Sequence, residues 1–329
     1  MNKLAIIIPA FKATFFEEAL KSLAQQTLNN FNVYIGDDCS HEDLKTIVKR
    51  FSELDIVYHR FQDNMGARNM VNQWRRCVEL SQNEDWIWLF SDDDYVDKNC
   101  VENFYRRIER DQNQIDVYRF NTVVVNKDKE LIWRSPLSPL WESSEKMAYE
   151  LLLGNRGNSI SDHIFKRSIY VENGGFIFTE YAQGADWATS IKFSKRNGLG
   201  TIAESNFYWR YSGLNVSASN QADKQKMVKG HLQFIKWTKK HFKYLQKGGY
   251  DISHNQMLEA IKTNLNTVLQ NHYKSLSGYN LLLVVIFYFS NFFDKSTWRN
   301  TITLINKTEN PIRTTGRKFK KLFSNLDRS

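Results

Sequence analysis

The sequence is poor in cysteine, proline and glycine: its 329 residues include three cysteines, four prolines and 15 glycines. The cysteines are odd in number and form no CxxC pair, and the seven histidines show no zinc-binding spacing. These shortages argue against a disulfide scaffold and a structural zinc site, and they predict a reducing compartment. With 42% hydrophobic and 14% aromatic residues, the composition is that of a folded globular protein.

Long apolar runs are also scarce. Leu4–Ala10 is too short for the apolar region of a secretory signal, so we expect a cytoplasmic protein. The most apolar run, residues 279–293, has 15 residues, whereas a spanning helix needs about 20. Two interpretations stay open for it: packing in the core, or shallow burial at the inner face of the cell membrane, which the basic tail at 313–323 would favour.

The net charge of +9 is unevenly distributed. Residues 1–219 contain 26 Lys and Arg against 30 Asp and Glu, whereas residues 220–247 contain eight lysines and one acid. The last 36 residues add nine basic and three acidic side chains. The basic character therefore belongs to the C-terminal third. No nucleic-acid recognition motif accompanies it, so we expect no nucleic-acid partner.

The N-terminal half alternates predicted strands and helices. Apolar, β-branched runs predict strands at 3–11, 32–38, 55–61, 85–90 and 115–126. Amphipathic stretches predict helices at 15–28, 41–54 and 67–81, the second opened by a capping box of Ser40 and Asp43. This alternation predicts an α/β fold with a mainly parallel sheet and helices on both faces.

Unusual residues cluster where three of these strands end. They are Pro9–Phe11, Asp37 with Asp38, and Ser91 followed by Asp92, Asp93 and Asp94. In α/β sheets, ligands bind outside the carboxyl ends of the strands. Ordinary polar loops would explain one acidic strand end, but they explain two or three poorly.

Three mechanisms would account for adjacent acids at a strand end. An EF-hand loop fails, because its fifth and sixth positions would be Val96 and Asp97. A haloacid-dehalogenase-type phosphatase with Asp92 as its nucleophile matches "DDDYV", but its motifs would then occur in reversed order. The third is a divalent cation that bridges the carboxylates to a diphosphate and offsets their repulsion.

Four motifs in series carry a resemblance to a known family. "IIIPAFKA", "SLAQQTLNNFNVYIGDDCS", "DNMGARN" and "DWIWLFSDDD" resemble the family 2 glycosyltransferases in order and spacing. The resemblance runs from residue 3 to about 215. It implies a GT-A catalytic domain over 1–215, and residues 216–329 would form a helical, basic region with possible membrane-surface contact.

The resemblance also implies a nucleotide site. Pro9, Ala10 and Phe11 match the part that backs the base and ribose. Asp38, with Asp37 beside it, matches an acid that accepts a hydrogen bond from a uracil N–H. Arg68, Asp92 and Asp93 match residues near the base and phosphates. Asp92, Asp93 and Asp94 match the metal motif for Mn²⁺ or Mg²⁺. Its register is open: Asp92 and Asp94 are favoured as the pair, and in the alternative Ser91 replaces the first acid and Asp93 is the ligand.

The same resemblance implies a catalytic base. Asp186 in "GADW" matches the acid that deprotonates the acceptor hydroxyl, although Ala185 replaces the usual glutamate before it. Arg210 matches a residue near the diphosphate. The implied reaction is inverting transfer from a UDP-sugar to a saccharide or lipid-linked saccharide in surface glycan synthesis. A protein of this fold that binds nucleotide or glycan without catalysis is the alternative, as is the phosphatase.

Overall fold

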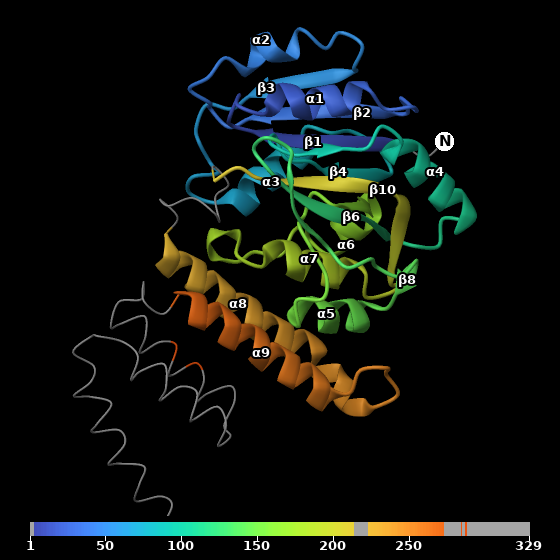
Figure 1. Cartoon of the computed structure of the whole chain (residues 1–329), viewed down its shortest axis with the longest axis vertical. Coiled ribbons are helices and arrows are strands. Elements are labelled where there is room, and N and C mark those ends of the chain that lie inside the picture. The colour runs from blue at the N-terminus through green and yellow to red at the C-terminus, as the bar shows by residue number, and fades with distance from the viewer. Residues whose placement is uncertain (1–2, 214–222, 273–283, 285–286, 288–329) are drawn as a thin grey trace, which may run out of the picture.

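The computed structural model of the chain describes residues 3–213, 223–272, 284 and 287. Their strands form one ten-stranded sheet in the order β3-β2-β1-β4-β9-β6-β10-β5, with β7 on β6 and β8 on β10 (Figure 1). The strands are β1 Leu4–Ala10, β2 Phe31–Asp37, β3 Ile56–Arg60, β4 Trp86–Leu89, β5 Tyr95–Val96, β6 Val117–Asn126, β7 Leu131–Arg134, β8 Trp141–Glu142, β9 His163–Lys166 and β10 Leu199–Tyr211.

Helices cover both faces of this sheet (Figure 1). They are α1 Phe16–Ala24, α2 Leu44–Val48, α3 Met70–Val78, α4 Cys100–Arg110, α5 Ser144–Leu152, α6 Arg167–Glu172, α7 Ala185–Phe193, α8 Lys224–His241 and α9 His254–His272, with 3₁₀ turns η1 Glu180–Ala182 and η2 Phe242–Lys247. The predicted strands and helices of the N-terminal half are therefore present, with shorter bounds.

The register of the parallel strands brings their carboxyl ends to one edge. Strand β1 runs parallel to β2 and β4, with Ala10 opposite Asp37 and Ile7 opposite Leu89. Strand β9, which the periodicity did not predict, lies antiparallel between β4 and β6. The sheet is therefore mixed at its centre, but the three strand ends singled out in the sequence do meet.

A separate hydrophobic cluster covers each face. Side chains alternate along a strand, so Ile6 and Ile8 enter the cluster under α1, α2 and α4. Ala5 and Ile7 enter the other cluster, which continues into α3, α5, α7, α8 and α9. The C-terminal helices thus share a core with the sheet. The division of the chain at residue 215 stays a prediction.

The predicted helix at 41–54 is wrong in length and in its cap. The helix covers only Leu44–Val48, and its cap is the carboxylate of Asp43, which accepts the backbone N–H of Thr46 at 3.0 Å. Ser40 instead donates its hydroxyl to the carbonyl of Phe11 at 2.6 Å. The Ser40 side chain is therefore used to join the ends of β1 and β2 rather than to begin a helix.

The C-terminal apolar run and basic tail lie outside the described residues, except for two positions. Val284 is buried in the cluster with α8 and α9, and Phe287 packs against that cluster. Of the two interpretations of this apolar run, packing in the core therefore applies at Val284 and Phe287. None of the described helices has the length and apolar character needed to cross a membrane.

Gly230 of α8 packs against the backbone of Glu180, in the segment before α7. A Cβ atom at this position would lie 1.9 Å from the carbonyl oxygen of Glu180, which is backbone and cannot rotate away. We expect Gly230→Ala to lower the free energy of unfolding by about 1–3 kcal/mol, measured by urea denaturation. Lys236→Ala, on the exposed side of the same helix, should change it by less than about 0.5 kcal/mol. Equal stability of the two variants would contradict this packing.

Candidate active site

The ends of β1, β2 and β4 are tied together by hydrogen bonds. The N–H of Asp38 donates to the carbonyl of Ala10 at 2.9 Å. The backbone N–H groups of Phe11 and Lys12 donate to Asp92 Oδ2 at 2.7 and 3.0 Å. The structure therefore brings together Pro9–Phe11, Asp37, Asp38 and Asp92, as expected from the sequence.

Asp38 is a buried acceptor surrounded by donors. Its Oδ1 accepts the N–H of Met65 at 2.7 Å and Nη2 of Arg76 at 2.6 Å, and its Oδ2 accepts the N–H of Gly66 at 2.8 Å. Gly66 has no room for a side chain, because its Cβ would lie 2.6 Å from Asp38 Oδ2. The turn at 65–66 is thus folded around this carboxylate.

The arginine that contacts Asp38 is Arg76, not Arg68. Arg68 is 63% exposed at its side chain and pairs with Asp63, which also pairs with Arg76 at 2.9 Å. Arg76 stacks on Phe61, 3.8 Å from the ring centroid. The sequence did not indicate a role for Arg76, because this residue lies in the middle of α3. Its contact with Asp38 forms only where α3 packs beside the end of β2. Arg68 stays a predicted phosphate contact.

Asp37 is held by structural partners. Its Oδ2 accepts the hydroxyl of Tyr58 and Nη1 of Arg60, the latter at 2.9 Å, and its Oδ1 accepts the N–H of Ser40 at 2.8 Å. Burial and this carboxylate raise the pKa of the Tyr58 hydroxyl. These contacts use Asp37 to join β2 to β3, and Asp37 is 0% exposed whereas Asp38 is 5% exposed, which favours Asp38 over Asp37 as the residue facing a ligand.

The three adjacent aspartates have different surroundings. Asp92 and Asp93 are partly exposed, and the Ser91 hydroxyl donates to Asp93 Oδ1 at 2.5 Å. Asp94 is only 2% exposed, and its Oδ1 accepts the N–H of Arg210 at 2.9 Å. Burial, then the charge of Asp93, raises the pKa of Asp92 to about 6. The same causes raise the pKa of Asp94 well above its usual range, and burial raises that of Asp93.

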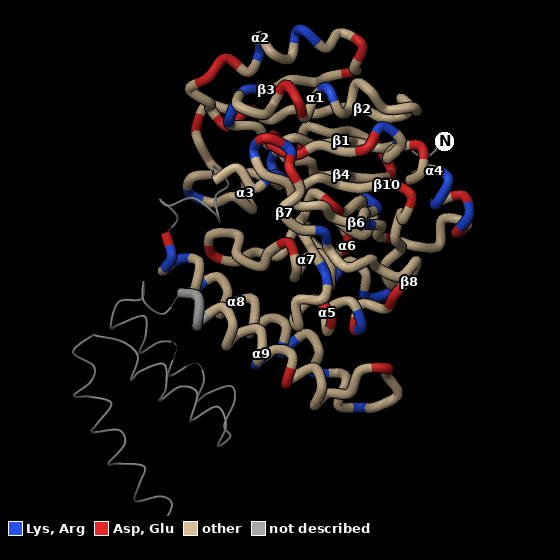
Figure 2. The backbone as a smooth tube through the Cα atoms, viewed as in Figure 1, with Lys and Arg blue, Asp and Glu red and all other residues tan. Residues whose placement is uncertain are grey.

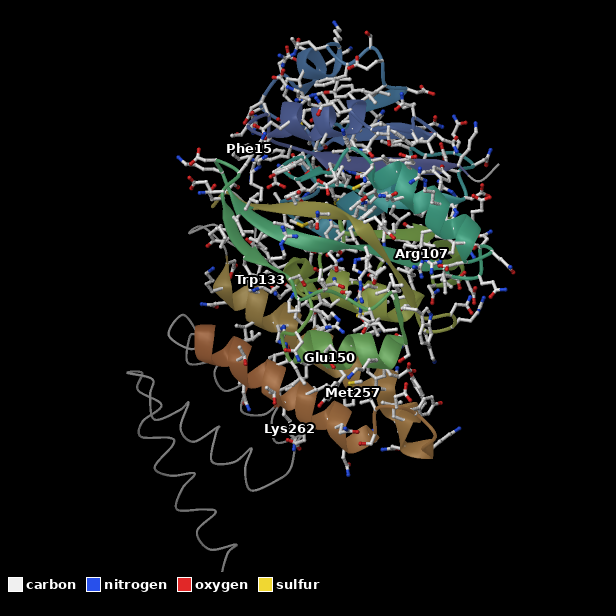
Figure 3. All side chains as sticks on the ribbon, turned by 45° about the vertical axis from the view of Figure 1, so that its right-hand side comes forward. Phe15, Arg107, Trp133, Glu150, Met257 and Lys262 are labelled. Atoms are coloured by element: carbon white, nitrogen blue, oxygen red, sulfur yellow. The ribbon has the colours of Figure 1, made fainter. Side chains whose placement is uncertain are left out.

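Arg210 holds in place the acidic segment, which consists of Asp92, Asp93 and Asp94. Its fully buried guanidinium donates to the carbonyl of Asp93 at 2.9 Å and the carbonyl of Lys127 at 3.0 Å, and it pairs with Glu18 at 2.6 Å. It also lies over the ring of Phe15, which Figure 3 labels, at 4.2 Å from the centroid. Four chain segments therefore meet at this side chain. The expected diphosphate contact of Arg210 stays a prediction.

Asp186 lies in the first turn of α7, near Asp162 and His163. Gly184 precedes it with φ 75°, and a Cβ there would lie 2.7 Å from Phe234. Asp186 Oδ1 accepts the N–H of Trp187 at 2.9 Å. Burial, opposed by this hydrogen bond, raises the pKa of Asp186 to about 7; the nearby charge of Asp162 also raises it, and that of His163 lowers it.

The acidic segment fits a cation only with help from a ligand. Within the part of the chain that the structure describes, no group of three or more His, Cys, Asp and Glu side chains is placed to hold a metal ion. Mg²⁺ is usually held by one or two carboxylates, with phosphate oxygens and water completing its shell. Asp92 and Asp93, the partly exposed pair, match that donor set. A diphosphate would supply the rest.

Comparison with known proteins then assigns the family. The model of Glycosyl transferase family 2 matches residues 5–172, just over half of the chain. The chain belongs to this family. An uncharacterized glycosyltransferase of Haemophilus influenzae is 29% identical over 174 residues, covering 52% of this chain and 55% of that protein. The glycosyltransferase GlyA of Streptococcus pneumoniae is 27% identical over 126 residues, covering 36% of this chain and 17% of that protein.

Solved structures with the same fold include S. aureus TarS 1-349. Its complex with UDP-GlcNAc superposes with a TM-score of 0.61 at 16% identity, and its complex with UDP with 0.57 at 17%. Both cover 92% of this chain and 79% of the TarS chain. The expected GT-A fold is thereby confirmed, and membership of family 2 argues against the phosphatase alternative. The chain spans only part of the length of the two sequence relatives.

Removing the Arg210 guanidinium should loosen this edge of the protein. We expect Arg210→Ala to lower the free energy of unfolding by about 3 kcal/mol, because Glu18 and two carbonyls lose a buried donor. Urea denaturation measures the loss. Tyr211→Ala is the matched control, since the neighbouring Tyr211 is about half exposed. A loss no larger than the control's would mean that the four segments hold together without Arg210.

The raised pKa of Asp186 carries a stability consequence. An acid whose pKa is higher in the folded state than its unfolded value of about 4 takes up protons on folding, so its contribution to stability falls as pH rises from about 4 to about 7. We expect Asp186→Asn to raise the melting temperature relative to wild type at about pH 8 and to change it little at about pH 4. An identical difference at both pH values would contradict the shift.

Proposed function

We propose that this protein is an inverting glycosyltransferase. It transfers a sugar from a nucleotide-diphosphate donor, with UDP-sugar favoured, to a hydroxyl of a saccharide acceptor in surface polysaccharide or lipid-linked glycan synthesis. The observation that carries the proposal is the convergence of Phe11, Asp38 and the Asp92–Asp94 segment at one sheet edge, in a chain of glycosyltransferase family 2. The complexes of TarS with UDP-GlcNAc and UDP support a donor of this class.

Asp38 retains the capacity to read a nucleobase. A carboxylate has about four acceptor positions, and the three protein donors to Asp38 use three of them. The remaining one suits the ring N–H of uracil, which is a donor. Pro9, Ala10 and Phe11 would back the base and ribose, and Arg68 would lie toward the phosphates.

The Asp92–Asp94 segment would hold Mn²⁺ or Mg²⁺. Asp92 and Asp93 are the better ligands, because Asp94 is nearly inaccessible and binds the end of β10. This assignment favours the register in which Ser91 replaces an acid and Asp93 is the principal ligand. When bound, the cation would supply positive charge against the departing diphosphate.

Asp186 would act as the base. A base works best with a pKa near the operating pH, and burial brings the pKa of Asp186 to about 7. Asp186 would take the proton of the acceptor hydroxyl while that oxygen forms a bond to the anomeric carbon. The bond from this carbon to the diphosphate oxygen breaks, and its electron pair leaves with the nucleotide. Attack opposite the leaving group inverts the configuration.

The C-terminal region would face an anionic membrane. We propose that the protein works in the cytoplasm at the inner face of the cell membrane, with its basic side chains toward the lipid. The exposed lysines Lys236, Lys240, Lys243 and Lys247 of α8 and η2 support this orientation. Each basic side chain near an anionic surface contributes about 1 kcal/mol.

A thermal-shift assay with UDP, GDP and CMP, each with and without Mn²⁺, tests the donor proposal. A ligand at about 100 times its dissociation constant stabilises by about 2.7 kcal/mol. We expect the largest shift with UDP and Mn²⁺ together. Asp93→Asn should remove the metal-dependent part, whereas Asp251→Asn, an exposed acid on the far loop, should not. A shift with GDP alone would overturn the role of Asp38, and no shift with any nucleotide would favour the non-catalytic alternative.

A further inference from the structure

The strand β7 exposes apolar side chains on both of its faces. Leu131, Ile132 and Trp133 are 62%, 52% and 43% exposed. The register of β7 shifts where it pairs with β6, with Trp133 opposite Val124 and Leu131 opposite Val125. Consecutive residues of β6 point to opposite faces, so Leu131 and Trp133 lie on different faces. Among the described strands, β7 pairs only with β6, so its other edge has no partner strand. Exposed apolar edge strands are normally shielded, and a contiguous exposed apolar patch usually has a partner.

One end of β7 is anchored at the acidic segment. The turn between β6 and β7 is held by the bond from Arg210 to the carbonyl of Lys127 at 3.0 Å, and the same guanidinium binds the carbonyl of Asp93. Lys129 in this turn pairs with Glu18 at 3.0 Å. The strand therefore begins beside the proposed metal and diphosphate site.

The other end of β7 is anchored beside the helix of Asp186. Ser135, the next residue after the strand, accepts the N–H of Gly157 on its hydroxyl at 2.9 Å. The adjacent Asn158 accepts the hydroxyl of Ser190 at 2.9 Å, and that hydroxyl also lies 3.1 Å from the carbonyl of Asp186. The four residues of β7 span about 13 Å, between the turn bound by Arg210 and the segment that Gly157 and Asn158 link to α7. Figure 3 shows Trp133 on the same side of the molecule as Phe15.

The charge of the turn between β6 and β7 does not favour binding to an anionic surface. Lys127, Asp128, Lys129 and Glu130 alternate in sign along the turn, which shows both colours in Figure 2. Their sum is zero, so the turn would gain nothing from anionic lipid headgroups. We therefore expect the partner of strand β7 to be neutral and to have apolar faces.

We propose that β7 is the wall of the acceptor site and that Trp133 binds the apolar face of an acceptor sugar ring. Pyranose rings carry C–H groups on their faces and hydroxyls at their rims, so a large ring such as indole covers the face while its N–H and nearby polar groups remain available. Binding sites combine aromatic walls with a few polar groups in this way. This inference rests on the proposed function and names the acceptor class as a neutral pyranose saccharide.

The test uses the full-length protein and three neutral disaccharides, cellobiose, lactose and maltose. Release of UDP from a UDP-sugar is measured with and without each disaccharide, and disaccharide binding is measured separately by thermal shift. We expect Trp133→Ala to raise the disaccharide KM and dissociation constant about tenfold, with an unchanged KM for the UDP-sugar and unchanged slow release by water. Trp133→Phe should restore part of the loss. Tyr250→Ala removes another exposed aromatic ring and should have no effect.

The outcomes separate this inference from the proposed function. Equal disaccharide affinity in wild type and Trp133→Ala would overturn the inference, as would a wild-type protein that binds none of the three. A Trp133→Ala variant that loses binding to phosphatidylglycerol vesicles, or loses self-association in sedimentation, with unchanged disaccharide affinity would instead assign β7 to a membrane or to a second copy. Absence of UDP release in a wild type that binds disaccharides through Trp133 would count against the proposed function alone.

Discussion

The burial of one guanidinium determines how this site is assembled. Arg210 is the last but one residue of β10, and its side chain contacts α1 through Glu18, the acidic segment through Asp93 and the β6–β7 turn through Lys127. A buried cation is costly unless its donors are matched, so these three segments must approach to within hydrogen-bond distance. Although burial opposes the effect, Lys129 and Arg210 hold the pKa of Glu18 below its ordinary value. The position of the proposed donor and acceptor subsites thus depends on this contact.

The Asp92–Asp94 segment and Asp186 have different electrostatic environments. At the Asp92–Asp94 segment, carboxylates are crowded and partly desolvated, which disfavours their charged forms until a cation arrives. At Asp186, a single carboxylate is desolvated near the charges of Asp162 and His163, which leaves it able to exchange a proton near neutrality. A metal-dependent leaving-group site and a proton-accepting site require these two different environments.

Sequence patterns predicted the strand ends well, because each strand end depends on a short local pattern, an apolar run followed by proline or acidic residues. They did not predict β9, whose four residues lie between β4 and β6 only through long-range pairing. The choice of Arg76 over Arg68 beside Asp38, and the use of Asp37 by Tyr58 and Arg60, also depend on which elements become neighbours. Local periodicity carries no information on these contacts. The apolar β7 was visible in the sequence only as part of an unassigned stretch.

The two hydrophobic clusters have a consequence for how such a protein can diverge. The loops that bear Phe11 and the acidic segment lead into α1 and α4, which pack on one face of the sheet, whereas Asp186 lies in the first turn of a helix that packs on the other. Since the two clusters share no buried side chain among the described residues, one core can be repacked while the shape of the other is retained. In this proposal, a lineage could exchange one acceptor for another without disturbing the half that receives the nucleotide.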